Sequence, residues 1–262
     1  MTLFTPNGKL LPLPQFLDAL KAGADPNEHW VGGTSRIPLF EAAKGNFHHL
    51  RHLLADPRTR VNIVDRDGAS PLIVALKYNH VRAVHVLLTC MKQQVNQPDR
   101  YGAAPLHHAV HNEGDGVLRQ LLSAGADPNS HGPYGRTPLM ELLLEHSSEH
   151  ATIEGKARVL MSKGADPNLC DDNGRTALHA AAVSGYHHVI DALLEFGADA
   201  DRRSRDGLTP LQEASSMRAV GPFQEPFQRI VQRLEQHNRG RLQDLVHMDI
   251  QRQMRVEERR AL

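Results

Sequence analysis

The chain has 262 residues, and its 40% hydrophobic content is enough to build a continuous core. Its 30 basic and 30 acidic side chains cancel, so no overall field draws the protein to nucleic acid or to an anionic membrane. Two cysteines, Cys90 and Cys170, exclude the disulfide framework of a small secreted domain. The N-terminal residues resemble neither a signal peptide nor a membrane span, so we expect a soluble cytoplasmic protein.

Helix starts recur along the whole chain. A Pro-Leu dipeptide, or Ala-Leu in one case, is often preceded by Ser or Thr, which caps helices, and Pro is favoured as a first helical residue. These starts are Pro38, Pro71, Pro105, Pro138, Ala177 and Pro210, at spacings of 33, 34, 33, 39 and 33 residues. A second marker, Gly-Ala-Asp, follows apolar runs from residues 23, 125, 164 and 197, where glycine ends a helix. The two markers predict one helix pair per unit.

The fifth unit carries the clearest family signature. Residues 175–185 read Arg-Thr-Ala-Leu-His-Ala-Ala-Ala-Val-Ser-Gly, followed by Leu193-Leu194 and by Gly-Ala-Asp at 197–199. This pattern closely resembles the ankyrin repeat. The resemblance covers about residues 13–238 and implies an all-α solenoid of helix-turn-helix pairs with β-turn tips. It gives an N-terminal half-repeat and then six units, starting near residues 33, 65, 99, 132, 171 and 204.

The segments outside these units are predicted to close the stack. We expect an N-terminal capping segment over 1–32, six repeats over 33–238 and a charged capping helix over 239–262. Insertions lengthen two units at about 145–155 and 218–226. Two departures weaken local boundaries: residues 89–94 lack the Gly-Ala-Asp marker, and Ile37 and Ala104 replace the capping Thr.

The sequence contains little that indicates catalysis or a cofactor. Three histidine pairs at helical spacing, 48/52, 107/111 and 146/150, raise the alternative of a metal-dependent enzyme, but no third ligand can be named for any of them. The resemblance instead places His107 and His179 at a histidine that bonds neighbouring turns. Asp65, Asp99 and Asp171 recur at one turn position, where Asp bonds its own backbone. No nucleophile elbow or phosphate-binding loop appears, so we expect no enzyme, metal or cofactor.

The candidate binding residues lie where the fold does not require them, at the turn tips and the exposed ends of the first helices. One Arg occurs in every unit, two or five residues before the helix start, and aromatic residues accompany these positions. Arg, Tyr and Trp are enriched at binding hot spots. The predicted partner-binding residues are Trp30, Arg36, Arg66, Tyr78, Arg100, Tyr101, His111, Tyr134, Arg136, Arg175 and Arg205. The alternative is that they are ordinary solvated surface.

We therefore predict a non-enzymatic module, monomeric when free, that binds another protein in a concave groove. The resemblance leaves open an adaptor, a bacterial effector, or an immunity-type inhibitor of a toxin or enzyme. The Asp-Pro-Asn variant at residues 25–27, 127–129 and 166–168 favours a bacterial source. Nucleic-acid binding through the Arg and Tyr side chains is a further alternative, which the zero net charge disfavours.

Overall fold

The computed structural model describes residues 2–29, 37–144, 150–218 and 228–241, together with residues 243 and 248. Helices joined by turns make up this described part, in which the only β-bridge is an isolated one between Phe4 and Leu10. The chain forms two compact units, residues 1–142 with 158–166, and residues 143–157 with 167–262. We describe each of them by itself.

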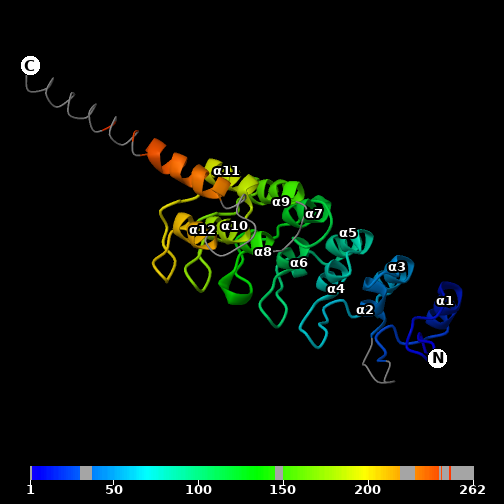
Figure 1. The fold of residues 1–262 in the computed structure, drawn as a ribbon. Coiled ribbons are helices and arrows are strands. Elements are labelled where there is room, and N and C mark those ends of the chain that lie inside the picture. Colours follow the sequence, from blue (N-terminus) through cyan, green and yellow to red (C-terminus); the bar gives the residue numbers. More distant parts are fainter. Residues whose placement is uncertain are drawn as a thin grey trace, which may run out of the picture. The chain divides into compact units, whose positions relative to one another are not determined.

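The first unit is a stack of helix pairs arranged in two layers (Figure 1). Helices α2 (Pro38–Ala43), α4 (Pro71–Lys77) and α6 (Pro105–Ala109) form one layer, in which neighbours pack on one another. The other layer contains α1 (Leu13–Lys21), α3 (Phe47–Ala55), α5 (Val81–Cys90) and α7 (Gly116–Ser123). Leucines from both layers, among them Leu39, Leu72, Leu106, Leu53 and Leu121, are completely buried between them. Helices α8 (Pro138–Leu144) and α9 (His150–Ser162) contribute residues to both units.

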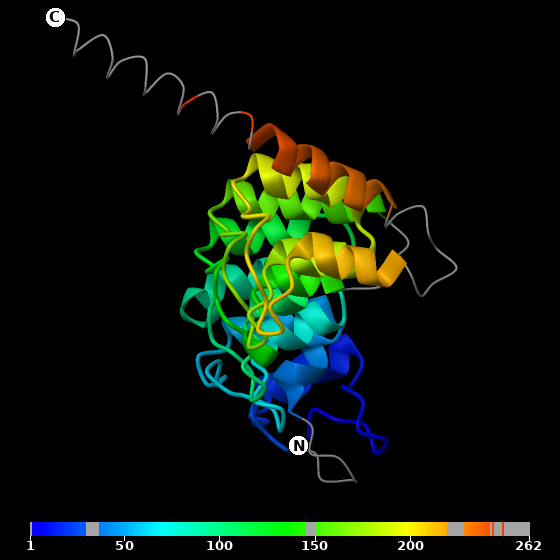
Figure 2. The same ribbon diagram turned by 60° about the vertical axis from the view of Figure 1, so that its left-hand side comes forward.

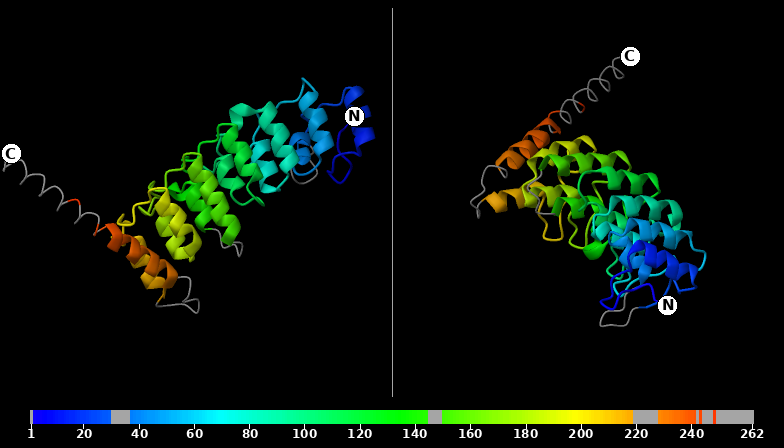
Figure 3. Two further views of the ribbon diagram at one scale, coloured as in Figure 1. Left: turned by 90° about the horizontal axis from the view of Figure 1, so that it is seen from above. Right: turned by 90° about the vertical axis from the view of Figure 1, so that its right-hand side faces the viewer.

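The second unit repeats the same arrangement. Helices α10 (Ala177–Ser184), α11 (His187–Glu195) and α12 (Pro210–Arg218) are followed by a helix over 228–241. This last helix, orange in Figures 2 and 3, buries Ile230 and Leu234 and forms an ion pair of 3.1 Å from Arg233 to Asp191 of α11. This helix continues through residue 239, which is the predicted start of the C-terminal capping helix. Residues 145–149 and 219–227, in the two predicted insertions, lie outside the described residues.

The helices begin where the sequence predicts. Pro38, Pro71, Pro105, Pro138, Ala177 and Pro210 are each the first residue of a helix. Ser70 Oγ accepts from the Ile73 N–H at 3.3 Å, and Thr209 Oγ1 accepts from the Gln212 N–H at 3.3 Å, as capping side chains do. Local residues also determine where helices end. Gly23, Gly125, Gly164 and Gly197 each follow a helix and have positive φ.

Among the residues that the structure describes, five tight turns precede the helices α4, α6, α8, α10 and α12, and each has the same hydrogen-bond pattern. We number them by the repeat unit that each one begins: the second turn (65–69), third turn (99–103), fourth turn (132–136), fifth turn (171–175) and sixth turn (204–208). In every one, the first residue's N–H donates to the fifth residue's carbonyl at 2.8–3.0 Å, and the fourth residue is a glycine with positive φ. The predicted Asp bonds are confirmed: Oδ1 of Asp65, Asp99 and Asp171 each accepts two backbone N–H groups of its own turn.

Asparagine side chains join loops that follow α1, α3, α5, α7, α9 and α11. Asn129 Nδ2 donates to the Gly164 carbonyl at 2.9 Å, while its Oδ1 accepts from the Asp166 N–H at 2.8 Å. Asn27, Asn96 and Asn168 make the same two bonds with their own following loops. We call this two-bond contact the Asn clamp.

The clamp is altered in the second repeat unit, where residues 89–94 lack the Gly-Ala-Asp marker. There a short 3-10 helix, η1 (Lys92–Gln94), takes its place, and Gln94 Nε2 donates to Asn62 Oδ1 at 3.1 Å and to the Val61 carbonyl at 3.2 Å. Gln94 is buried, and within the described part of the chain no group hydrogen-bonds its Oε1.

Candidate protein-interaction surface

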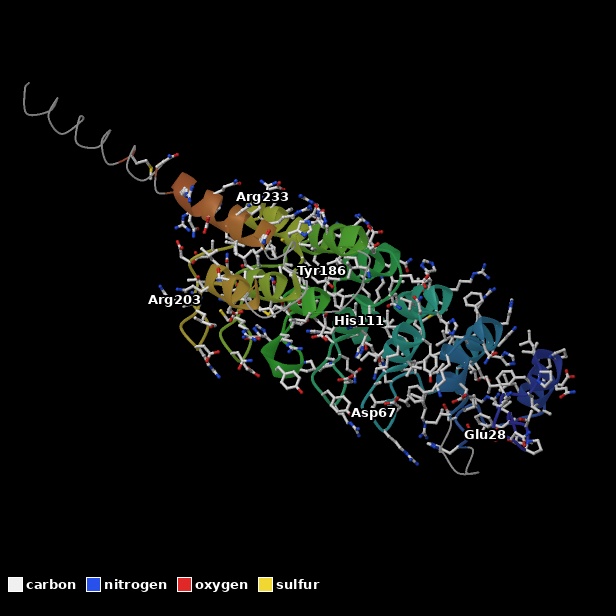
Figure 4. The ribbon with its side chains drawn as sticks, in the orientation of Figure 1. Glu28, Asp67, His111, Tyr186, Arg203 and Arg233 are labelled. Carbon is white, nitrogen blue, oxygen red and sulfur yellow. The ribbon has the colours of Figure 1, made fainter. Side chains whose placement is uncertain are left out.

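The described arginines that recur before the helix starts divide into two groups according to their place in the turn. Arg66, Arg100 and Arg205 are the second residues of their turns and are exposed. Arg100 is held there by the second turn: its N–H donates to the Asp67 carbonyl at 2.9 Å, and its guanidinium lies 2.8 Å from Asp67 Oδ1. Arg205 N–H makes the corresponding bond of 2.8 Å, to the Asn173 carbonyl of the fifth turn. Figure 4 labels Asp67 at its turn.

The other two arginines, Arg136 and Arg175, are the last residues of their turns and lie against helices. Arg175 Nε donates to Oε1 of the buried Glu213 at 3.0 Å. Arg136 Nη1 lies 3.6 Å from Glu141 Oε2, with both side chains about 30% exposed. Glu141 and Glu213 occupy the same position in α8 and α12. An Arg two residues before a helix start therefore does not lie at a turn tip.

Three exposed tyrosines accompany the turns of the first unit. Tyr101 is 57% exposed and Tyr134 is 70% exposed, with the guanidinium carbons of Arg100 and Arg136 at 4.7 and 5.1 Å from their ring centres. Tyr134 is left-handed, with φ 59° and ψ 24°. Tyr78 follows α4 and is 53% exposed, with the Lys44 ammonium 5.8 Å from its ring centre. Trp30 and Arg36 lie outside the described residues.

A cleft opens between the third and fourth turns. The bond that ties the third turn to the second cannot be repeated here, because Pro133 occupies the position of Arg100 and has no N–H. The cleft has a volume of about 280 Å³. Its walls are Lys77, Asp99, Tyr101, Ala103, His107, His108, His111, Pro133 and Glu141. Two of the predicted binding residues, Tyr101 and His111, therefore share one concave site (Figure 4 labels His111).

The floor of this cleft is a compact charge network. Asp99 is buried, and its Oδ2 accepts from His108 Nε2 at 3.0 Å and lies 3.7 Å from Lys77 Nζ. Burial lowers the pKa of His108, so its neutral ring donates this bond. At the rim, His111 Nε2 lies 3.9 Å from Glu141 Oε1. Each charge in the cleft has an opposite charge close by.

Histidine serves structure in this fold, as the sequence predicts for His107 and His179. His107 Nδ1 accepts from the Ala104 N–H at 3.2 Å, and its Nε2–H donates to the Arg136 carbonyl at 3.0 Å. His179 bonds Thr176 and the Leu208 carbonyl in the same way. Burial lowers the pKa of both rings. In the ranges that the structure describes, no group of three or more His, Cys, Asp or Glu side chains could hold a metal ion; His146 lies outside them.

Sequence reasoning finds the exposed tyrosines but misses the cleft. Pro133 is its signal, as a turn residue that stands where the preceding turn has Arg. The contact among Lys77, Asp99 and His108 has no sequence motif, because it joins a helix end, a turn and a neighbouring helix.

Comparison with known families agrees with this geometry. A model of ankyrin repeats in three copies matches residues 39–132 and 148–222. The chain belongs to the ankyrin-repeat family. Ankyrin repeats are modules of protein–protein interaction, and the fold is in general non-enzymatic. No helix among the described residues is long and apolar enough to span a membrane.

Individual relatives cover parts of the ankyrin chain. The mouse B-cell lymphoma 3 protein homolog is 31% identical over 169 residues, which are 63% of this chain and 37% of that protein. The putative ankyrin repeat protein YahD of Escherichia coli is 30% identical over 135 residues, 50% of this chain and 66% of the relative. The chain thus spans little more than a third of the mouse relative.

Solved structures match over more of the chain. An ankyrin repeat domain of Acinetobacter baumannii aligns with a TM-score of 0.62 and 28% identity, over 75% of this chain and 95% of that one. A chain from the complex of a Bdellovibrio bacteriovorus predatory endopeptidase with an immunity protein aligns with a TM-score of 0.59 and 26% identity, over 78% of this chain and 99% of that one.

Proposed function

We propose that this protein binds a partner protein, without catalysis, through the surface formed by its second, third and fourth turns and the helix ends beside them. The observation that carries the proposal is Tyr134, a bulky side chain held at positive φ and largely in solvent. A left-handed conformation costs an L-residue about 1–2 kcal/mol, and Gly, Asn or Asp would fit the position better. Strain of this kind persists where a function requires the side chain.

The neighbouring residues give this surface the character of a binding hot spot. Tyr101 and Tyr134 stand on adjacent turns with stacked arginines, so both rings are presented in fixed orientations. Rigid aromatic side chains lose little conformational entropy on binding. The arginines themselves are paired with Asp67 and Glu141, which leaves few free cations for phosphates. This pairing supports a protein partner over a nucleic acid.

A second, more specific candidate is inhibition of an enzyme by occlusion, as an immunity-type protein. It is favoured by the likeness to a chain of the endopeptidase–immunity protein complex, which covers 99% of that chain. The bacterial effector and adaptor remain outcomes of the same experiment, because the captured partner decides between them.

The test is capture of the partner on the immobilised protein, followed by titration with single variants. Tyr101→Ala, Tyr134→Asn and Arg136→Ala should each weaken binding by about 1–3 kcal/mol, as expected for hot-spot contacts. Arg100→Ala and Tyr78→Ala belong to the same set. Asn tolerates the left-handed turn, so Tyr134→Asn should leave the free energy of unfolding nearly unchanged.

The matched control is Arg119→Ala on α7, an exposed arginine that is likewise paired with a carboxylate, Asp115, but lies away from the turns. Its affinity should equal that of the unaltered protein. If all the turn variants also retain full affinity while folded, the proposed surface is wrong. Arg175 and Arg205 of the second unit then become the next candidates.

A further inference from the structure

We propose that the cleft between the third and fourth turns holds one uncharged aromatic side chain of the partner, a tyrosine whose hydroxyl reaches the Glu141 carboxylate. The inference rests on the proposed function and names the anchor residue of that interaction.

The cleft is a built feature of the backbone. The second and third turns are in close contact, and a Cβ added to Gly68 would lie 2.7 Å from the Arg100 nitrogen. At the equivalent Gly102 the nearest atom of the fourth turn is 3.9 Å away. Pro133 removes the donor that would tie the two turns together. The separation is therefore fixed by the sequence of the fourth turn and does not depend on a side-chain rotamer.

The size and the walls suit a single planar side chain. At about 280 Å³ the cleft lies just below the range of about 300–1,000 Å³ that holds whole small ligands. Its lining includes four residues with ring side chains, Tyr101, Pro133, His107 and His108, together with Ala103. Aromatic rings pack against one another in stacked or edge-to-face geometry, and each such pair adds about 0.5–1.5 kcal/mol to simple burial.

The charges exclude an ionised occupant. Lys77 pairs with Asp99, and Arg136 pairs with Glu141, so a Lys, Arg, Asp or Glu from the partner would lose its hydration without gaining an unpaired counter-charge. A neutral occupant pays far less. Burial lowers the pKa of His108, which keeps this wall uncharged near neutral pH.

The rim favours a hydroxyl over a purely apolar ring. Glu141 has its two neighbours, Arg136 Nη1 and His111 Nε2, at 3.6 and 3.9 Å, beyond the distance of an ordinary hydrogen bond. A carboxylate has about four acceptor sites, so Glu141 can accept a phenolic O–H at the mouth of the cleft. Tyrosine offers both the ring and this donor.

The experiment uses side-chain analogues, so it needs no identified partner. The full chain is titrated with p-cresol, toluene, n-butylammonium and propionate, and the ring resonances of Tyr101, His108 and His111 are followed by NMR. We expect saturable shifts with p-cresol, several-fold weaker binding of toluene, and no saturable shifts with either ion. Tyr101→Ala should weaken p-cresol binding at least about fivefold. Phe196→Ala, which removes an exposed aromatic ring outside the cleft and outside the proposed surface, should leave it unchanged.

Two results would overturn the anchor: shifts of these resonances by n-butylammonium or propionate as large as those by p-cresol, or equal p-cresol affinity of Tyr101→Ala and the unaltered protein. Far-UV circular dichroism shows that each variant is folded. The proposed function is tested separately by the partner titration. If p-cresol does not shift the cleft resonances but the turn variants lose partner affinity, the proposed tyrosine anchor is rejected and the proposed surface is retained. Saturable p-cresol binding by the unaltered protein, together with unchanged partner affinity in all the turn variants, would reject the proposed surface.

Discussion

A Cβ at Gly68 should disturb two turns at once. Gly68 has φ 70°, so Gly68→Ala places an L-residue in the left-handed region at about 1–2 kcal/mol, partly offset by the lower entropy of the unfolded chain. The new methyl would also lie 2.7 Å from the Arg100 nitrogen, a backbone atom that cannot rotate away. The third turn must shift, and the 2.9 Å bond from Arg100 N–H to the Asp67 carbonyl is lost, which costs about a further 1 kcal/mol.

Gly102→Ala separates these two costs. Gly102 has the same place in the third turn and φ 85°, but its Cβ would meet only ordinary van der Waals contact at 3.9 Å. We expect Gly68→Ala to lower the free energy of unfolding by about 1–2 kcal/mol more than Gly102→Ala.

Urea titration followed by circular dichroism measures this difference, and amide exchange at Arg100 reports the broken bond. Gly174→Ala, with the Arg205 nitrogen 3.1 Å from its Cβ, should fall between the two. Equal destabilisation by Gly68→Ala and Gly102→Ala would refute the contact between the second and third turns, and with it the explanation of why the cleft lies next to Pro133.

Three further predictions concern polar side chains that hold the fold together. Asn129→Ala should lower the free energy of unfolding by about 1–3 kcal/mol in urea titrations, because both bonds of its clamp are lost; no change would mean that the loops hold together without it. Asp99→Asn should lower the free energy of unfolding by about 1–3 kcal/mol and weaken the bond to His108. An NMR titration of His108 would then show a changed pKa, and an unchanged titration would contradict the contact. Burial lowers the pKa of His107 and His179, so below the ordinary value of about 6.5 the unfolded chain binds protons that the folded chain does not. The urea midpoint should therefore hold above about pH 6.5 and fall as the pH is lowered towards 5.5, less steeply in His179→Gln; a flat profile would argue against neutral rings.

Local chemistry explains why the helix boundaries could be predicted from the sequence. A capping Ser70 or Thr209, a Pro at the first helical position and a Gly after the last turn act within a few residues, and the structure places each where expected. The role of His107 also follows from its motif. Ala104 has no side-chain oxygen to cap α6, but its N–H donates to His107 Nδ1. The helix therefore starts at the expected residue without a capping Thr.

The surface could be predicted only in part, because its contacts join residues that are distant in the sequence. Arg100 and Arg136 look alike in the repeat pattern, but one is the second residue of its turn and the other the last. That difference sends one guanidinium to Asp67 of the preceding turn and the other to Glu141 in its own unit. The cleft depends on a missing bond to a neighbouring turn, which no single-unit pattern records.

The altered clamp at Asn62 has a mechanical consequence. Force applied to the two ends of a repeat stack is carried from loop to loop, and each Asn clamp resists it with two bonds to backbone groups of the next loop. At Asn62 the resistance comes from the amide of Gln94, on a side chain that can rotate and whose oxygen already lacks a bond. Under stretching, the contact between residues 61–62 and 92–95 should therefore break first. The N-terminal helices would then separate while the three turns of the interaction surface stay together.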